Sequence, residues 1–408
     1  MRFDALIIGA ELDAWVAAAR LLELGKSVCI AAPGEGSLHY AAGGLRVLGR
    51  VNGGERHVEA PFDAMAALDD RHPYRRCGEE MIRAALAWFA GSPLGAGFGP
   101  GLGADQNSLV VTPAGLTLPV FSACRHQATT ERIAGRKLVL CQFCGHRDLP
   151  VGLIAAELAR RGERTEVINI DPPDDRTESV AIARAFDSLG DARSWFAGLK
   201  TALPDDAEVV LLPAVLGHER HNEIVVSATD ELGLPVFEVP TLPPCLPGIR
   251  LSEACERHVE RQLGIVRAGC RIAGMNADND RVVSVRDDTG RLIEASIFVL
   301  ATGGVLMGGL QVDSRGRVGE PALGLAVYQT EPLSRGDAEE TVAALHRAGV
   351  ETDASFRPRH GASKPWRNLF VTGRNLAHWD PGAEISADGV AIVSGWAAVE
   401  AARAELGV

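Results

Sequence analysis

FDALIIGAELDA, residues Phe3–Ala14, combines a short apolar run, a glycine turn and the start of a helical pattern. The helical pattern continues over Leu12–Leu24 and stops at Gly25, and a second apolar run follows at Ser27–Ala32. A strand, a helix and a second strand within about 30 residues form a βαβ unit, whose crossover makes the two strands parallel. The amino terminus therefore predicts an α/β protein with a parallel sheet.

The turn after the first strand matches part of the glycine fingerprint that binds dinucleotides. In that fingerprint the first glycine permits a tight turn, the second lets the backbone meet the pyrophosphate, and the third lets helix and strand pack closely. Gly9 fits the first position, and Ala14 is a small residue at the third. Glu11 stands at the second, where its carboxylate would meet a phosphate at the helix N-terminus. This window leaves two interpretations open, a dinucleotide site and a βαβ unit that binds no dinucleotide.

The second strand lacks the acidic residue that usually grips an adenosine ribose. It ends in Ala31-Ala32, and the nearby Glu35 lies beyond the expected position. A later apolar run, Leu292–Leu300, ends in Ala301–Gly304, whose small residues would let the strand pass close to a ligand. Within that segment Thr302 and Gly303 are candidate cofactor contacts.

A third segment of the same type lies near the carboxyl terminus. Asn368–Val371 is strand-like and is followed by Thr372-Gly373, by Asp380 and by a helix that opens at Gly389. Asp380 would accept a hydrogen bond from a ribityl hydroxyl, or would begin a turn with the proline after it. Asp388 would cap its own helix and compete with a flavin for the amide groups there.

The middle of the chain repeats the strand and helix rhythm with different parts. Strands are expected at Lys137–Cys141, Thr165–Ile170, Glu208–Pro213 and Pro235–Val239, and helices at Val151–Arg161 and Asn222–Glu231. We therefore predict an α/β protein with a Rossmann-like FAD/NAD(P)-binding fold that is split across both chain ends. Residues 1–50, 250–330 and 364–408 would form the flavin-type dinucleotide-binding domain, and residues 51–249 a large inserted α/β cap domain.

Composition excludes several classes of function. A net charge of −12 disfavours a nucleic-acid surface, which needs clustered Lys and Arg. No apolar run approaches the roughly 20 residues of a membrane span, and the first strand leaves no room for a signal peptide. Eight scattered cysteines indicate reduced, cytoplasmic thiols. No nucleophile triad or metal cluster is expected.

A few side chains remain as candidates for chemistry. Arg46, Arg250 and Arg357 could hold an anionic substrate or a flavin phosphate, although each could equally be a surface or interdomain ion pair. His39 and His72 could act as acid or base, but one histidine carries no specificity.

Cys141 and Cys144 form a CxxC pair at the end of a predicted strand. Their context lacks both the further ligands of a zinc site and the helix of a thioredoxin. Strand-end thiols are favoured over a redox dithiol.

Taken together, these segments are similar to the B subunits of anaerobic glycerol-3-phosphate dehydrogenases, nearly end to end. The matching stretches are Met1–Asp4, Leu38–Tyr40 with Gly43, His72–Tyr74, Val111–Pro113 with Gly115, Ile182–Arg184, Pro213-Ala214, Pro240–Pro244, Gly248–Leu251, Glu320-Pro321, Leu323–Leu325, Thr352-Asp353, Arg357-Pro358, Asn368–Phe370, Gly373 and Asp380-Pro381. The proline-rich run that leads into Arg250 is the specific part.

The resemblance implies a protein that uses FMN, with FAD the less expected flavin, and that works beside an FAD-containing catalytic A subunit and a membrane-associated iron–sulfur C subunit. Such a complex oxidises sn-glycerol 3-phosphate to dihydroxyacetone phosphate and passes electrons to quinone. The chain would be cytoplasmic and held at the inner face of the membrane by a partner. The residues expected at the cofactor are Gly9, Ala14, Gly43, Gly44, Thr302, Gly303, Gly373, Asp380 and Gly389; the catalytic candidates are His39, Arg250 and Arg357.

Three departures from the family pattern fall at this expected cofactor site. Glu11 replaces a glycine; Ala41, Ala42 and Gly44 replace serines; and Glu384–Asp388 replaces a glycine-rich turn. The alternative is therefore a non-catalytic scaffold subunit that has lost its cofactor. A third hypothesis is a free-standing oxidoreductase that acts on another small 2-hydroxy compound.

Overall fold

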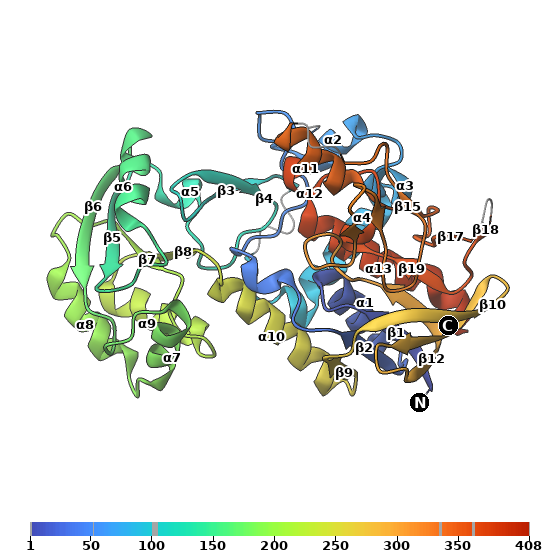
Figure 1. Cartoon of the computed structure of the whole chain (residues 1–408). Coiled ribbons are helices and arrows are strands. Elements are labelled where there is room, and N and C mark those ends of the chain that lie inside the picture. Colours follow the sequence, from blue (N-terminus) through green and yellow to red (C-terminus); the bar gives the residue numbers. More distant parts are fainter. Residues whose placement is uncertain (1, 52, 100–104, 334–336, 361–363, 408) are drawn as a thin grey trace. The chain divides into compact units, whose positions relative to one another are not determined.

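The computed structural model describes residues 2–51, 53–99, 105–333, 337–360 and 364–407. Its contacts divide the chain into two compact units. The first contains Met1–Leu38, Arg46–Ala96 and Ser252–Val408, and the second contains His39–Leu45 and Gly97–Leu251. Both chain ends thus belong to one unit, in which Figure 1 labels β1 and α13.

The first unit is built on a seven-stranded sheet in the order β10-β11-β12-β1-β2-β9, with β19 also paired to β12. The strands are β1 Arg2–Ile8, β2 Val28–Ala32, β9 Ile265–Ala268, β10 Ile272–Asp278, β11 Arg281–Asp287, β12 Leu292–Leu300 and β19 Leu369–Val371. β9, β2, β1, β12 and β19 run parallel, while β10 and β11 run antiparallel to their neighbours. In register, Ile8 lies beside both Leu300 and Ala31, so the carboxyl ends of β1, β2 and β12 meet at one edge.

Two long helices pack together within this unit, α1 Leu12–Glu23 and α13 Ala387–Leu406. α1 follows β1 directly, and its apolar residues are buried. α13 is buried along most of its length. Gly395 allows the close approach, because a Cβ there would lie 2.6 Å from the backbone oxygen of Asp13. The sheet prediction is confirmed: the two ends of the chain share one core.

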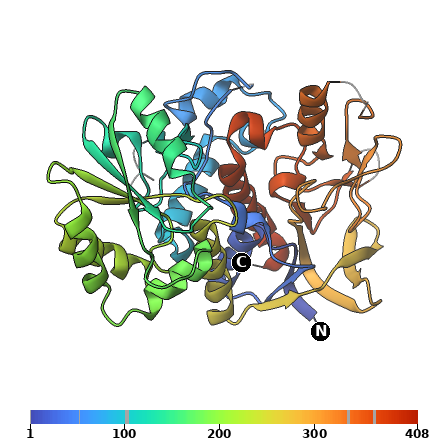
Figure 2. The same cartoon turned by 60° about the vertical axis from the view of Figure 1, so that its left-hand side comes forward.

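The second unit holds a four-stranded parallel sheet in the order β6-β5-β7-β8. Its elements are β3 Ser108–Val111, β4 Thr117–Val120, α5 Thr130–Ile133, β5 Lys137–Phe143, α6 Val151–Arg160, β6 Arg164–Ile170, α7 Ser179–Ser188, α8 Ala192–Ala202, β7 Val209–Pro213, α9 His221–Leu232 and β8 Val236–Val239. Leu211 packs with Ile154 of α6, whereas Val210 and Leu212 pack with Phe186 of α7 on the opposite face. Helices therefore cover both faces of this sheet (Figure 2).

The remaining elements are short, apart from α4, α10 and α11. They are η1 Ser37–Tyr40, α2 Pro61–Ala64, η2 Met65–Ala67, α3 Pro73–Cys77, α4 Glu79–Gly91, η3 Pro93–Gly95, α10 Leu246–Arg261, β13 Gln311–Val312, β14 Val318–Gly319, β15 Val327–Tyr328, α11 Ala338–Arg347, β16 Gly349–Val350, β17 Arg359–His360, β18 Lys364–Pro365, η5 Gly373–Asn375 and α12 Pro381–Glu384. Within the described residues, no helix combines the length and the apolar character that crossing a membrane requires.

The boundary of the insert differs from the sequence-based division. The sequence-based division places residues 51–96 in the cap, whereas contacts place Arg46–Ala96 in the first unit. The reason is tertiary: α4 packs on α13, the Tyr74 hydroxyl donates to the Val47 carbonyl at 2.8 Å, and His72 contacts Glu384 at 2.9 Å. None of these contacts leaves a local pattern in the sequence.

Candidate cofactor site

The Gly9 turn lies against the end of β12. Gly9 has a φ of +119°, and a Cβ at this position would lie 1.9 Å from the carbonyl oxygen of Ala301. Only glycine allows both the conformation and the approach. The first position of the fingerprint therefore has the backbone that the sequence predicts.

The Gly373 turn meets the first turn of α1. The Thr372 hydroxyl donates to Asp13 Oδ2 at 2.6 Å, and the Gly373 amide donates to Ser394 Oγ at 2.9 Å. A Cβ on Gly373 would lie 2.5 Å from the same Asp13 oxygen. The turns at Gly9 and Gly373 are thus brought together around the start of α1.

Asn375 joins the ends of β12 and β19, and the sequence reasoning did not single it out. It is fully buried, and its Oδ1 accepts hydrogen bonds from Thr302 Oγ1 at 3.2 Å and from the Gly304 amide at 3.0 Å. Gly303 adopts a φ of +78°, and a Cβ there would touch Met307 and the Glu11 side chain. The predicted Thr302 and Gly303 therefore lie where the Gly9 and Gly373 turns meet, a region that we call the corner. Other parts of the chain cover much of both residues.

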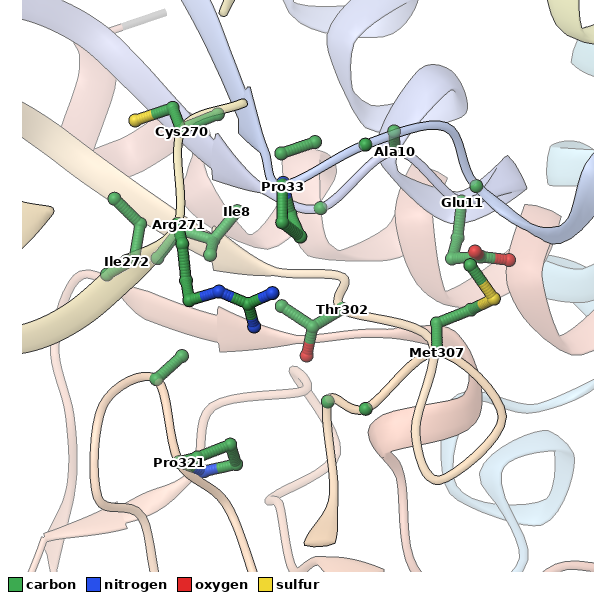
Figure 3. A pocket seen from close by; sticks show the side chains of 18 of the residues that line it. Ile8, Ala10, Glu11, Pro33, Cys270, Arg271, Ile272, Thr302, Met307 and Pro321 are labelled. Carbon is green, nitrogen blue, oxygen red and sulfur yellow. The ribbon is translucent and has the colours of Figure 1, made fainter. Parts of the chain in front are cut away.

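A cavity of about 180 Å³ opens at the carboxyl ends of β1 and β2. Its walls include Ile8, Glu11, Pro33, Arg271 and Thr302, as Figure 3 shows. Cavities that enclose a drug-sized ligand usually measure about 300–1,000 Å³. The space beside β2 is thus small for the adenosine half of a dinucleotide.

Glu11 closes this cavity on one side with two hydrogen bonds. Only 7% of the residue is exposed; Oε1 accepts from the Ser37 amide at 2.7 Å, and Oε2 accepts from the Ser37 hydroxyl at 2.5 Å. Position 36, beside this contact, has room only for a glycine, because a Cβ there would lie 2.1 Å from the Ala10 carbonyl oxygen. We call the contact of Glu11 with Ser37 the Glu11 clasp.

Asp13 adds a second acid to the same helix start. It is 2% exposed. Burial raises its pKa to about 7, the Thr372 hydrogen bond lowers it, and the nearby Glu11 charge raises it. The signal in the sequence was an acid between Leu12 and Ala14, inside an otherwise apolar helix face.

The backbone conformation of the corner is suited to a cofactor, but the charge of its side chains is not. The glycine turn and the helix start that follows it, where the N-cap residue makes no side-chain hydrogen bond, are suited to an anion. The Glu11 carboxylate lies at that helix start, where it would repel a phosphate. β2 ends in Ala31-Ala32 and offers no acid to a ribose. These residues do not fit the diphosphate and adenosine of FAD.

Asp388 has a different role from the predicted helix cap. Ser386 is the N-cap residue of α13, and Asp388 binds Arg46 instead, with its Oδ2 2.7 Å from Nε and its Oδ1 2.9 Å from Nη2. The Arg46 amide also donates to Oδ2 at 3.1 Å. The Asp388 charge raises the pKa of Arg46. The pair occupies the N-terminus of α13.

Gly389, Ala14 and Asp380 have packing or capping contacts of their own. A Cβ on Gly389 would lie 2.2 Å from the Tyr74 hydroxyl, and Ala14 is fully buried. Asp380 caps α12 by accepting from the Gly382 and Ala383 amides, as the turn interpretation expects. That these residues bind a flavin remains a prediction.

The predicted Gly43 and Gly44 belong to the second unit, with φ values of +77° and +84°. A Cβ on Gly44 would lie 2.8 Å from Val120 Cγ1, so this loop packs on β4. The neighbouring Ala42 carbonyl accepts from Gln127 Nε2 at 3.3 Å. Ala41 precedes it in the same loop.

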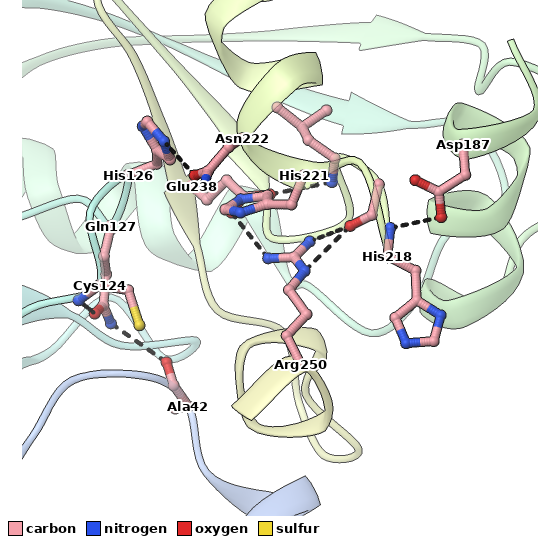
Figure 4. Close-up of polar contacts among 12 residues, drawn as sticks. Ala42, Cys124, His126, Gln127, Asp187, His218, His221, Asn222, Glu238 and Arg250 are labelled. Atoms are coloured by element: carbon pink, nitrogen blue, oxygen red, sulfur yellow. Dashed lines mark hydrogen bonds and ion pairs between the residues drawn. The ribbon is translucent and has the colours of Figure 1, made fainter. Parts of the chain in front are cut away.

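Arg250 takes part in a polar cluster of the second unit (Figure 4). Its Nε donates to the Gly217 carbonyl at 3.1 Å, and its Nη1 lies 3.5 Å from Glu238 Oε2. Glu238 is 4% exposed and lies 2.7 Å from His221 Nε2. Burial raises the pKa of Glu238, but the charges of His221 and Arg250 outweigh it and hold the pKa at about 2. The Arg250 guanidinium is thus held within the second unit by a backbone carbonyl and by the Glu238 carboxylate.

The other catalytic candidates have internal partners as well. Arg357 Nε donates to Asp353 Oδ2 at 2.9 Å. The His39 carbonyl accepts from the Cys245 amide at 2.8 Å, and its ring centroid lies 4.0 Å from that of Tyr40. Sequence reasoning missed Glu238 and His221, which are 17 positions apart in the chain and show no shared motif.

The CxxC pair lacks the properties of a redox dithiol. Cys141 is buried in β5, and burial raises its pKa to about 12. Cys144 is exposed, and its hydrogen bond with Asp171 raises its pKa. Reactive thiols have lowered pKa values, so the strand-end interpretation is favoured. Across the described residues, no group of His, Cys, Asp and Glu has the arrangement of a metal site.

Fold and corner together define a protein of the flavoprotein class, and the chain matches the FAD binding domain family over residues 4–389. Within that class, the chain belongs to the family of B subunits of anaerobic glycerol-3-phosphate dehydrogenase. The B subunit of that name from Vibrio cholerae serotype O1 is 30% identical over 98% of this chain and 96% of its own length. A relative from Halobacterium salinarum, named as a probable B subunit, is 30% identical over 98% of this chain and 97% of its own. The family is one of flavin-dependent oxidoreductases.

Solved structures with lower similarity span the chain as well. A 3-ketosteroid-Δ4-(5α)-dehydrogenase from Rhodococcus jostii is 12% identical, covers 98% of this chain and 96% of its own, and has a TM-score of 0.37. A glycine oxidase from Bacillus cereus is 12% identical over 98% and 94%, with a TM-score of 0.36.

Proposed function

We propose that this chain is the B subunit of a complex that oxidises sn-glycerol 3-phosphate to dihydroxyacetone phosphate. In this proposal an FAD-containing A subunit carries out the oxidation, and a membrane-associated iron–sulfur C subunit passes the electrons to quinone. The observation that carries the proposal is the match to relatives named as B subunits over 98% of this chain and at least 96% of theirs. A match of that extent spans nearly the whole length of both proteins.

For the chain's own flavin we propose FMN rather than FAD. FMN needs neither a ribose acid at the end of β2 nor room for adenosine beside it, and the cavity there measures only about 180 Å³. The Glu11 clasp lies where a single phosphate would also approach the helix, so we expect weak flavin binding.

The second candidate function is a scaffold subunit without a cofactor. Three acids favour it, because each is satisfied from within the chain: Glu11 by Ser37, Asp13 by Thr372, and Asp388 by Arg46. A pocket whose polar groups are already paired gains less from a ligand.

Reconstitution of the complex tests the assignment. The tagged chain is co-purified with untagged A and C subunits, and glycerol 3-phosphate-dependent reduction of a dye and of a quinone is measured with and without this chain. The proposal expects quinone reduction only when the chain is present. Failure to co-purify, or oxidation of another 2-hydroxy compound by the isolated chain, would overturn it and favour a free-standing oxidoreductase.

The visible spectrum of the same preparation separates the two candidates. Flavin released by denaturation is identified by chromatography. FMN that stays with this chain in the complex supports the FMN proposal, whereas a flavin-free chain in an active complex establishes the scaffold.

A further inference from the structure

The first unit contains a second cavity, about 540 Å³ in volume. Its walls include His72, Tyr328, Arg347, Asp380 and Glu384. The volume lies within the usual range for small-molecule sites. None of its lining residues belongs to the cavity beside Glu11. We call it the Glu384 cavity.

Glu384 is fixed in the wall by three donors. The Tyr74 amide donates to His72 Nδ1 at 3.0 Å, which assigns the ring proton to Nε2. His72 Nε2 then donates to Glu384 Oε2 at 2.9 Å, and Ser386 donates to the same oxygen at 3.1 Å. Oε1 accepts only from the Asp380 amide, at 3.1 Å, among the described contacts. A carboxylate oxygen can accept more than one hydrogen bond, so Oε1 retains capacity for a ligand.

Asp380 offers a second acceptor. Its Oδ1 accepts from His346 Nδ1 at 2.9 Å and from the Gly382 and Ala383 amides, each at 3.0 Å. Burial raises its pKa, but these hydrogen bonds and the His346 charge outweigh it and lower the pKa. Its Oδ2 has no donor among the residues that the structure describes.

The segment that carries Asp380 and Glu384 is flanked by two residues with a strained backbone. His378 and Ile385 have φ values of +70° and +54°. Such conformations are disfavoured for non-glycine residues and gather at ligand sites, where the surroundings enforce them. His378 is held by Glu351 at 2.8 Å and lies against the Tyr328 ring at 4.1 Å between centroids. The acceptors are therefore preorganised.

The charges that line the cavity disfavour an anionic ligand. Asp69, Glu340, Asp380 and Glu384 line the cavity against only two guanidinium groups, those of Arg71 and Arg347, among its described lining residues. Arg71 already pairs with Asp69 at 3.1 Å. A phosphate dianion would meet an excess of negative charge. Arg347 is an exposed lining residue with no side-chain partner in the described part of the chain, so its donors are available to a ligand.

We propose that the Glu384 cavity binds a small neutral polyol, whose hydroxyls donate to Glu384 and Asp380 and accept from Arg347. Each hydroxyl is both donor and acceptor, which matches a wall that presents carboxylate oxygens and a guanidinium. The inference rests on this cavity alone and does not depend on the function proposed above.

Isothermal titration of the full chain with glycerol, sorbitol and myo-inositol tests the inference, with sn-glycerol 3-phosphate as the charged comparison. Saturable heat is the readout, because polyols also stabilise proteins without binding, by exclusion from the surface. Two variants alter the cavity differently: Arg347→Met removes the donor, and Ala343→Leu fills space without removing a polar group. Arg193→Met, on the exposed face of α8, is the matched control.

Saturable binding of at least one neutral polyol is expected. It should weaken about tenfold or more in Arg347→Met, which loses a charged donor, and in Ala343→Leu, which loses space, and stay unchanged in Arg193→Met. Three results would overturn the inference: no saturable binding of any of the three polyols, binding that both cavity variants retain, or tighter binding of sn-glycerol 3-phosphate than of the neutral polyols.

Discussion

Thr372 and Asp13 are 359 positions apart in the chain, yet the Thr372 hydroxyl donates to the Asp13 carboxyl at 2.6 Å. The contact ties the turn after β19 to the first turn of α1, and so joins the carboxyl-terminal segment to the amino-terminal βαβ unit. Gly373 beside it leaves no room for a side chain, because a Cβ would lie 2.5 Å from Asp13 Oδ2. The flavoprotein corner of this chain is therefore organised around a buried acid.

That acid makes the stability of the chain depend on pH. The pKa of Asp13 is about 7 in the folded chain, above its ordinary value of 3.8. Between these values the folded state binds more protons than the unfolded state, so the contribution to stability is full below about pH 4 and is lost as the pH rises through 7. Asp13→Asn removes this dependence and retains the acceptor for Thr372. Urea denaturation should show that the variant gains at least about 1 kcal/mol on wild type between pH 5 and pH 8.

Asp205→Asn, on an exposed loop, is the control for that series and should leave the pH profile unchanged. If Asp13→Asn and wild type lose stability in parallel over the same pH range, the buried acid is not the titrating group.

The frame of the fold could be predicted from the sequence, but several of its contacts could not. Apolar runs bounded by glycine located β1, α1, β12 and β19, because strand and helix periodicities are local. The place of residues 51–96 depends on α4 packing on α13, which no local pattern records. The sequence shows that Glu11 is a problem for a phosphate, yet its partner Ser37 lies 26 residues away at the start of η1.

The Arg46 and Asp388 pair stabilises the start of α13. Their side chains are only 28% and 15% exposed, and removal of the acid leaves a guanidinium with little solvent. Asp388→Asn should lower the free energy of unfolding by about 1–3 kcal/mol. Asp69→Asn breaks a pair in which both side chains are 53% exposed, and should change the same quantity by less than about 1 kcal/mol. Equal effects of the two variants would contradict this.

Gly389 is required by packing against Tyr74. Gly389→Ala places a methyl group 2.2 Å from the Tyr74 hydroxyl and should cost about 1–3 kcal/mol of stability. Tyr74→Phe removes that oxygen, so the double variant should be more stable than the sum of the single effects by about 1 kcal/mol. A double-mutant cycle in urea measures the coupling. Strict additivity would show that the glycine serves something other than this contact.

Glu238 is predicted to hold the polar cluster of the second unit together. Glu238→Gln removes the only carboxylate that faces both His221 and Arg250 among the described contacts, and should destabilise the chain by about 3–5 kcal/mol. Glu223→Gln affects an exposed pair with Arg220 and should have an effect below about 1 kcal/mol. Thermal and urea unfolding of both variants check this difference; a Glu238→Gln chain as stable as wild type would rule out the role.

The most direct measurement is the affinity of the flavin-free chain for FMN and FAD, by fluorescence titration of wild type and of Glu11→Gly. Glu11→Gln separates charge from bulk, and Glu35→Gln, an acid that lines the same cavity, is the control. Removal of the Glu11 carboxylate should tighten FMN binding about tenfold or more, with Glu35→Gln close to wild type. Unchanged or weaker binding in both Glu11 variants would contradict the claim that this acid occupies a flavin phosphate site.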